Sequence, residues 1–211
     1  MYMGLVQGVA DVVSADRKPD RVALKLAFPE HLTNGLVLGA SVSVEGVCLS
    51  VTSIEGNEVG FDATAGTLIS TNLGALDHDR LNIERSAKLG DEIGGHIVAG
   101  HVSGCATIVA METKPDAHMW MKLRLPQPWA RYVFDRGFLA VNGCSLTVAG
   151  VEDDLFTINL IPETLRQTTF GLYRVGEQVN FEVDQQTMVL VDTIERTVTS
   201  VLERLLPKTP A

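Results

Sequence analysis

Two short segments, 97 residues apart, each place a reactive side chain and a hydroxyl at positions i and i+2. The first, GVCLSVT, holds Cys48 and Ser50, and the second, GCSLTVA, holds Ser145 and Thr147. Residues two apart lie on one face of a β-strand, so each pair can meet the same ligand. Cysteine and serine can act as nucleophiles, and a neighbouring hydroxyl can donate or accept a hydrogen bond. Taken alone, these are also ordinary strand residues, because a free cysteine is usually a small buried hydrophobe.

Two histidines and one aspartate are the other candidates for acid–base chemistry. His96 and His101 lie five residues apart in the glycine-rich stretch GGHIVAGH. On a strand they would point to opposite faces, which disfavours a shared metal and favours structural or ligand-contacting roles. Asp184 follows the run VNFEV, where an isolated aspartate is usually a turn residue. The sequence has no nucleotide-binding glycine loop, no HExxH and no zinc-type cysteine cluster, so we expect no bound metal.

The two reactive segments belong to an internal repeat. A shift of 97 aligns residues 45–74 with 142–171 and gives eight identities in thirty positions, where about two are expected by chance. A shift of 96 aligns MGLVQGVADVV with AGHVSGCATIV, and a shift of 98 aligns LNIE with VNFE. Asp184 then falls opposite Ser86, so one copy carries the carboxylate. The chain is therefore predicted to contain two homologous halves, 1–97 and 98–187.

Each half has the pattern of a small antiparallel barrel or sandwich with six strands. Short runs rich in β-branched residues are separated by glycine or asparagine. The clearest runs are 5–13, 40–54, 57–63, 101–111, 119–125, 138–151, 155–161 and 178–183. Residues 66–73 and 163–170, which lie between strands, are expected to form short helices. An irregular connection is the alternative there, because threonine and asparagine are weak helix formers.

The tail has a heptad pattern that neither half shows. Charged residues separate apolar positions that follow steps of 3, 4, 3 and 4, namely Val191, Ile194, Val198, Val201 and Leu205. A helix of about 16 residues would span about 24 Å, and Pro207 is expected to end it. The helix could pack on its own domain, but a narrow apolar seam with charged flanks favours self-association.

Composition excludes several classes of protein. With 17 Lys and Arg against 26 Asp and Glu, the net charge is −9, which argues against a nucleic-acid partner. No apolar run approaches the roughly 18 residues that span a bilayer, and no basic leader precedes an apolar core. Cys48, Cys105 and Cys144 cannot all pair and lack CxxC spacing. We therefore expect a cytoplasmic protein with free thiols and no membrane partner.

Together these motifs resemble riboflavin synthase of the trimeric, two-barrel type. The resemblance is carried, in order along almost the whole chain, by MYMGLVQG, GVCLSVT, TNLG, DEIGGHIVAGHV, NGCSLTV, LIPETLRQTT and VNFEVD. It implies an all-β fold of two tandem homologous six-stranded antiparallel (Greek-key) β-barrels plus a C-terminal α-helix. The implied domains are an N-terminal lumazine-binding barrel over 1–97, a C-terminal one over 98–187, and a trimerisation helix over 188–211.

The same resemblance implies the reaction. Two molecules of 6,7-dimethyl-8-ribityllumazine would dismutate by four-carbon transfer to riboflavin and 5-amino-6-ribitylaminopyrimidinedione, with no metal or redox cofactor. The active site would form between the N-terminal barrel of one subunit and the C-terminal barrel of its neighbour in a homotrimer, and lumazine synthase is a further candidate partner. The alternative is a non-catalytic lumazine- or flavin-binding antenna protein of the same fold. Such antennae tend to be monomeric and lose parts of the histidine and C-terminal motifs, which this sequence keeps.

By resemblance, five residues would be catalytic: Cys48, Ser145, Asp184, His101 and Thr147. Ser145 and Asp184 would relay the C7-methyl proton, and Cys48 would add to the other lumazine or orient it. The N-terminal pocket would use Gly4, Leu5, Val6, Ser41, Cys48, Leu49, Ser50, Asp62, Ala63, Thr64, Ala65, Gly66, Thr67, Gly100, His101 and Val102. The C-terminal pocket would use Arg136, Ser145, Leu146, Thr147, Asn159, Leu160, Ile161, Pro162, Glu163 and Thr164.

The sequence departs from the family pattern at four positions. Tyr2 and Met3 stand where the family usually has Phe and Thr, so a hydroxyl is lost at position 3. Arg136 replaces a usual Lys and cannot act as a general base. Gly66 replaces the Glu expected by analogy with Glu163. We therefore expect the two pockets to differ from one another more than is usual.

Overall fold

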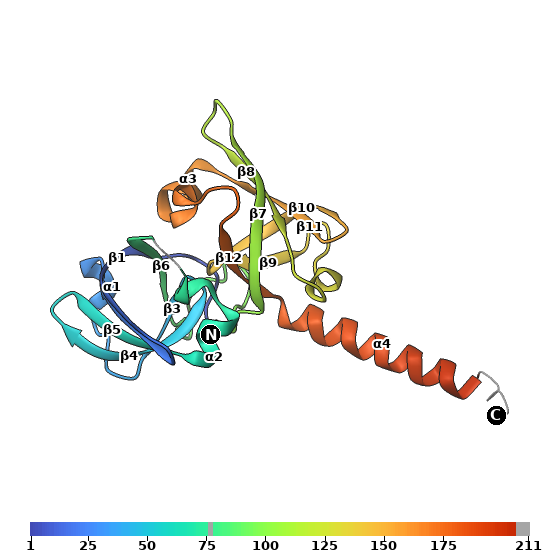
Figure 1. Cartoon of the computed structure of the whole chain (residues 1–211), viewed down its shortest axis with the longest axis horizontal. Helices are drawn as coiled ribbons and strands as arrows, with labels where there is room; N and C mark the ends of the chain where they lie inside the picture. The colour runs from blue at the N-terminus through green and yellow to red at the C-terminus, as the bar shows by residue number, and fades with distance from the viewer. Residues whose placement is uncertain (76–77, 206–211) are drawn as a thin grey trace.

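The computed structural model describes residues 1–75 and 78–205, and in these residues twelve strands close into two six-stranded antiparallel barrels (Figure 1). The N-terminal barrel contains β1 (Gly8–Lys18), β2 (Arg21–Ala27), β3 (Ser41–Val44), β4 (Val47–Glu55), β5 (Glu58–Thr64) and β6 (Arg80–Arg85). The C-terminal barrel contains β7 (Gly104–Thr113), β8 (Met119–Arg124), β9 (Phe138–Val141), β10 (Cys144–Glu152), β11 (Leu155–Leu160) and β12 (Gln178–Val183). The all-β prediction of two tandem barrels with a C-terminal helix is confirmed.

The two barrels share one topology. The first closes in the order β1-β2-β5-β4-β3-β6, and the second has the same order with every strand six numbers higher. The remaining short elements are α1 (Glu30–Thr33), α2 (Ala65–Ser70), η1 (Asn72–Gly74), η2 (Trp129–Tyr132), α3 (Pro162–Gln167) and η3 (Thr169–Leu172). Both segments expected to be short helices are helical, each with a break at an extended threonine, Thr71 or Thr168.

Buried and exposed side chains alternate along the strands, and this alternation decides which side chains a ligand can reach. Along β4, Val47, Leu49 and Val51 are buried inside the barrel, while Cys48 is half-buried and Ser50 exposed on its outside. The pattern repeats residue for residue along β10. Because apolar side chains fill each barrel, the reactive pairs lie on the outer surfaces.

A polar network with approximate two-fold symmetry joins the barrels. The Asn82 amide donates to the carbonyl oxygen of Asn142 (3.1 Å), and the Asn180 amide donates to the carbonyl oxygen of Glu45 (2.8 Å). Each of these two asparagines also accepts a backbone N–H from the other barrel, Thr169 to Asn82 (2.8 Å) being one case. All these side chains are buried, so the bonds fix the barrels against each other.

Glu45 breaks this symmetry because its counterpart is Asn142. The Glu45 carboxylate is fully buried and accepts from the Asn82 N–H (2.6 Å), the Thr169 hydroxyl (3.0 Å) and the Tyr173 hydroxyl (3.2 Å). Burial raises the pKa of Glu45 to about 7 against the opposing effect of these bonds. Of the pair Glu45 and Asn142, only one residue therefore carries a carboxyl group, where perfect duplication would have placed two or none.

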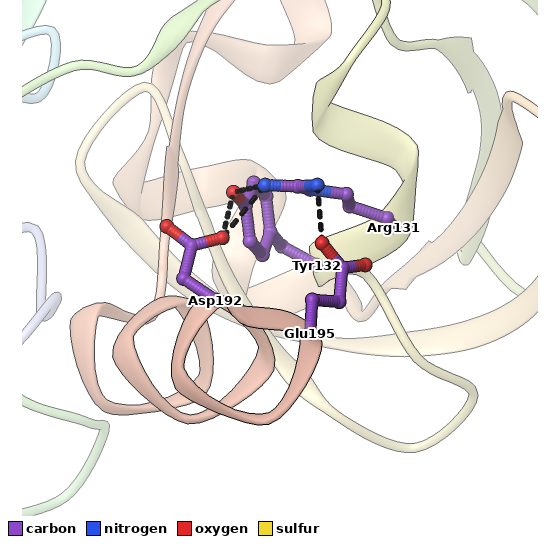
Figure 2. Close-up of polar contacts among 4 residues, drawn as sticks. All are labelled: Arg131, Tyr132, Asp192 and Glu195. Atoms are coloured by element: carbon purple, nitrogen blue, oxygen red, sulfur yellow. Dashed lines mark hydrogen bonds and ion pairs between the residues drawn. The ribbon is translucent and has the colours of Figure 1, made fainter. Parts of the chain in front are cut away.

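The C-terminal helix α4 (Gln185–Leu205) leaves the C-terminal barrel and projects away from both barrels (Figure 1). It begins three residues before 188, the boundary expected from the sequence. Its root is fixed by Arg131, which donates to Asp192 (2.6 Å) and Glu195 (2.7 Å), and by the Tyr132 hydroxyl, which donates to Asp192 at 2.6 Å (Figure 2).

Beyond its root, α4 exposes the apolar seam. Val191 packs partly against the C-terminal barrel, but Ile194, Val198, Val201 and Leu205 are 45–74% exposed. A helix packed on its own domain is therefore the wrong interpretation over most of its length. Pro207, which was expected to end the helix, lies outside the described residues. No helix within the described ranges is long and apolar enough to cross a membrane.

Candidate active site

The outer face around Cys48 is rich in hydroxyl groups. On neighbouring strands, Ser41 pairs with Ser50 and Ser43 pairs with Cys48, and paired residues share one face of a sheet. Ser86, the counterpart of Asp184, donates to the Ser41 carbonyl oxygen at 2.9 Å. Ser43 is buried, so this face can offer a ligand the hydroxyl groups of Ser41 and Ser50 and the thiol of Cys48.

The equivalent face around Ser145 has a different character. Phe138 pairs with Thr147 and Ala140 pairs with Ser145, so an aromatic ring and a methyl replace the two serines of the other barrel. Phe138 is 55% exposed, which leaves its ring available to a flat ligand. The ring also stacks on His96, with centroids 5.4 Å apart and planes 19° apart. This face is therefore more apolar than the first.

Two leading segments, residues 1–7 and 96–103, complete these faces by crossing between the barrels. The first leads into the N-terminal barrel, but its Gly4 carbonyl accepts the Ser145 N–H of the other barrel (2.8 Å). The second leads into the C-terminal barrel, but its Gly100 carbonyl accepts the Cys48 N–H (2.9 Å). The segments also pair with each other through Tyr2 and Val98. Each barrel therefore lends backbone to the other barrel's site.

Glycine is required at both crossing points. Gly4 and Gly100 have φ of +68° and +80°, in the left-handed region that favours glycine. A Cβ on Gly4 would lie 2.6 Å from the Ser145 Cβ, and one on Gly100 would lie 2.6 Å from the Cys48 Cβ. The backbone thus passes directly over each reactive side chain, which is the closeness a shared binding surface needs.

The C-terminal site contains an acid–base pair. The Nδ1 of His96 lies 2.6 Å from the Ser145 hydroxyl oxygen. Burial lowers the pKa of His96, and the charge of Asp184 opposes that effect. A neutral imidazole at this distance can accept the hydroxyl proton, which makes Ser145 able to pass on a proton taken from a ligand.

The N-terminal site holds its reactive group differently. The Tyr2 hydroxyl donates to the Cys48 sulfur at 3.1 Å. Burial, followed by the bond to Cys48, raises the pKa of Tyr2, so this phenol stays protonated and acts as a donor. Cys48 is thus positioned by a neutral hydrogen bond, whereas Ser145 is bonded to a base.

Three of the sequence-based assignments change in this structure. Asp184 accepts from the N–H (2.8 Å) and hydroxyl (2.6 Å) of Thr187. Within the described residues it therefore caps α4 and makes no hydrogen bond with Ser145, and a proton relay that involves Ser145 and Asp184 stays a prediction. His96, and not the predicted catalytic His101, contacts the Ser145 hydroxyl. Both histidines lie in an irregular segment, not on a strand, and His101 is exposed.

The other predicted contact residues divide by exposure. Leu49, Ala63, Leu146 and Leu160 point into the barrel cores, so they can meet a ligand through backbone atoms alone. The residues that are exposed beside the reactive strands are Leu5, Ser50, Asp62, Thr64, Ala65, Gly66, His101, Arg136, Thr147, Asn159, Ile161, Pro162 and Glu163. Half-buried beside the same strands are Val6, Ser41, Cys48, Thr67, Val102, Ser145 and Thr164.

Two of the departures from the family pattern, Gly66 and Arg136, change what the pockets can offer a ligand. Glu163 binds Arg166 and Gln167 within α3, while Gly66 at the matching place in α2 offers no side chain. The Arg136 side chain is 91% exposed and reaches Asp135 at 4.0 Å.

Across the part of the chain that the structure describes, no group of three or more His, Cys, Asp or Glu side chains could hold a metal ion.

Known proteins share this duplicated architecture. The family profile of the lumazine binding domain matches twice, over residues 3–86 and 99–184. Riboflavin synthase of Escherichia coli (strain K12) is 44% identical over 198 residues, covering 93% of this chain and 92% of that protein. Riboflavin synthase of Chlamydia pneumoniae is 38% identical over 201 residues, covering 95% and 98%.

Solved structures of LumP have the same fold. The LumP complex with riboflavin superposes with a TM-score of 0.81 at 24% identity, covering 88% of this chain and 100% of that one. The complex with 6,7-dimethyl-8-(1'-D-ribityl) lumazine gives a TM-score of 0.79 at 23% identity, covering 87% and 99%. With the two lumazine-binding repeats and the extent of identity to curated enzymes, the chain belongs to the riboflavin synthase family.

Proposed function

We propose that this protein is the enzyme that dismutates two molecules of 6,7-dimethyl-8-ribityllumazine into riboflavin and 5-amino-6-ribitylaminopyrimidinedione. The observation that carries the proposal is the pair of equivalent outer faces with unequal chemistry, His96–Ser145 on one and Tyr2–Cys48 on the other. Donor and acceptor are the same molecule, so two related pockets can bind both, and two different sets of groups can give them different roles. Holding both in near-attack geometry can supply much of the rate.

The proposed division of labour follows from proton transfer. The lumazine on the C-terminal barrel loses a C7-methyl proton to Ser145, whose own hydroxyl proton passes to His96. The lumazine on the N-terminal barrel, held beside Cys48, is the partner that this carbanion attacks. Tyr2 keeps the Cys48 sulfur oriented toward that partner. In these steps no side chain of the protein is oxidised or reduced.

The helix α4 supports a homotrimer as the working form. Its 21 residues span about 32 Å, and its apolar seam is exposed, so three copies can bury their seams together. Assembly would let the N-terminal barrel of one subunit face the C-terminal barrel of the next. Light scattering should give three times 22.8 kDa, and Val198→Asp should give the monomer with lost turnover. A fully active monomer would contradict an intersubunit site.

The competing function is an antenna protein that binds a lumazine or flavin without turnover. LumP, the structural neighbour, was solved with riboflavin and with flavin mononucleotide. Incubating the pure chain with 6,7-dimethyl-8-ribityllumazine alone, and following riboflavin absorbance, separates the two functions. Product formation supports the enzyme, and tight binding without product supports the antenna.

The three cysteines are free in the structure. A cytoplasmic location stays a prediction, as does an association with lumazine synthase.

A further inference from the structure

Two buried carboxylates that the proposed reaction does not use occupy equivalent places in the repeat. Glu84 lies on β6 and is 3% exposed, and Glu182 lies on β12 and is 8% exposed. Taking an ionised carboxylate out of water is costly unless donors surround it. In both cases the donors come from the backbone of a leading segment.

Glu84 holds the first leading segment. The Met3 N–H donates to its Oε1 at 2.7 Å. Burial raises the pKa of Glu84 to about 7, against the opposing effect of the N–H groups of Met3, Leu5 and Gly4, which face the carboxylate. Within the described residues Oε2 has no partner at hydrogen-bond geometry. Three successive N–H groups around a glycine of positive φ form a concave anion-binding nest.

Glu182 holds the second leading segment in the same way. The Ala99 N–H donates to its Oε1 (2.7 Å) and the Gly100 N–H to its Oε2 (2.9 Å). Burial raises the pKa of Glu182, while the N–H groups of Ala99 and Gly100 and the charge of His101 favour the ionised form. The repeat has therefore preserved a carboxylate-in-nest contact at both places.

The glycine in each nest also makes a backbone hydrogen bond to the reactive residue of the opposite barrel. The glycine whose N–H faces Glu84 offers its carbonyl to the Ser145 N–H, and the glycine bound by Glu182 offers its carbonyl to the Cys48 N–H. Glu84 belongs to the N-terminal barrel but acts on the C-terminal site, and Glu182 does the reverse. We propose that Glu84 and Glu182 are positioning residues that work across the barrels, each setting the geometry of the site on the other barrel. This inference builds on the proposed function but concerns site geometry, which can be measured without turnover.

The isosteric change of Glu to Gln tests the contact with little change in volume. In Glu182→Gln, the amide nitrogen replaces an oxygen that accepts an N–H, so the nest loses an acceptor and the leading segment moves off its site. In Glu84→Gln, the Met3 bond can persist, but the amide nitrogen turns an N–H toward the N–H groups of Gly4 and Leu5, which weakens the hold on the segment. Glu55→Gln and Glu152→Gln are matched controls, because these equivalent residues lie at the ends of β4 and β10, the strands that carry Cys48 and Ser145. Both are exposed and pair with Lys25 and Lys122.

The rate at which iodoacetamide alkylates Cys48 at pH 8, measured by peptide mass spectrometry, shows how accessible the N-terminal site is. Burial raises the pKa of Cys105 to about 11 and of Cys144 to about 12, so these thiols react slowly. Glu182→Gln should speed Cys48 alkylation at least fivefold, while Glu84→Gln and both controls leave it within twofold. Glu182→Asp keeps the charge and should fall between Glu182→Gln and the unmodified protein.

Histidine ¹H–¹⁵N spectra report the C-terminal site. Glu84→Gln should shift the His96 ring signals, because Ser145 moves relative to its Gly4 contact, while Glu182→Gln should shift those of His101. Crossed effects support the proposal even if the protein turns over no lumazine, so failure of the proposed function is a separate outcome. Equal effects of the two variants on both sites, or no effect on either, would overturn the proposal.

Discussion

The two barrels are alike inside and different outside. They share strand order, hairpin register and a core of alternating apolar residues. On the outer faces, half-buried Ser41 of one barrel is matched by exposed Phe138 of the other, whereas Ser43 and its counterpart Ala140 are both buried. Duplication has kept the positions that a closed barrel needs, while the groups that meet a ligand have diverged, and function follows those groups rather than the fold.

The difference also explains how a symmetric fold can run an asymmetric reaction. A base bonded to Ser145 exists on one face, whereas the reactive group of the other face is bonded to a neutral phenol, Tyr2. Two identical substrates therefore meet two environments, and each environment favours a different role in the reaction. If the two faces differ in this way, substitutions on them should have unequal effects.

The largest effect is expected at the C-terminal site. His96→Gln removes the proton acceptor and should lower kcat about a thousandfold, or about 4 kcal/mol in activation free energy. Ser145→Ala should lower kcat by more than tenfold for the same reason. Steady-state riboflavin formation measures both, with His118→Gln as a control on the exposed hairpin. A wild-type rate in His96→Gln would remove the proposed distinction between the barrels.

The next effect concerns stability at the junction. The Glu45 pKa of about 7 lies above that of an unfolded glutamate, so between about pH 4.5 and 7 the folded state binds more protons. The free energy of unfolding should therefore fall as pH rises through that window, by up to about 3 kcal/mol from this residue. Glu45→Gln should reduce the slope measured by urea unfolding without removing it, because burial also raises the pKa of Glu84 to about 7. An unchanged slope would show that Glu45 is already ionised throughout.

A smaller effect is expected where the leading segments cross. Gly4→Ala and Gly100→Ala introduce a Cβ into a left-handed backbone and a 2.6 Å contact. Gly35→Ala is the matched control, because Gly35 has φ +66° and nothing within 4 Å of the added Cβ. All three should lose about 1 kcal/mol from backbone strain, and the two crossing variants should lose about 1–2 kcal/mol more. Thermal unfolding measures the difference, and equal losses in all three would contradict the close crossing.

The smallest effect is expected at the N-terminal site. Cys48→Ser keeps a hydrogen-bonding group beside Tyr2 and should lower kcat somewhat more than tenfold, about 1.4 kcal/mol. Cys105→Ser is the control, since the Cys105 sulfur, on β7, faces the Ser70 carbonyl and the Asn180 side chain rather than Tyr2. If Cys48→Ser matched the loss in His96→Gln, the two sites would share the proton chemistry, and the comparison between barrels would need revision.

Much of the fold was predictable because its signals are local. The repeat, the alternation on β4 and β10, and the heptad seam each depend on spacing within a short window. The N-cap role of Asp184 also had a local signal, because this acceptor stands three residues before Thr187 at the start of a helix. An isolated aspartate after a strand favours a turn equally well.

The site was predictable only in part because it is built from distant segments. The contact of His96 with Ser145 joins residues 49 apart, and it depends on the crossing of two irregular leading segments. Assigning that glycine-rich stretch to a strand put His96 and His101 on opposite faces and hid the pairing. The cross-barrel bonds of Gly4 and Gly100 leave no periodic pattern, although their positive φ explains why glycine stands there.

Hydrogen–deuterium exchange at the C7 methyl of 6,7-dimethyl-8-ribityllumazine tests the central claim most directly. The exchange is followed by ¹H NMR in D₂O, with the rate in buffer alone subtracted. The account predicts that the protein accelerates exchange, that Cys48→Ser retains this acceleration, and that His96→Gln loses it, although both variants form riboflavin more slowly. Accelerated exchange that survives in His96→Gln, or that disappears in Cys48→Ser alone, would contradict the assignment of proton transfer to the C-terminal barrel.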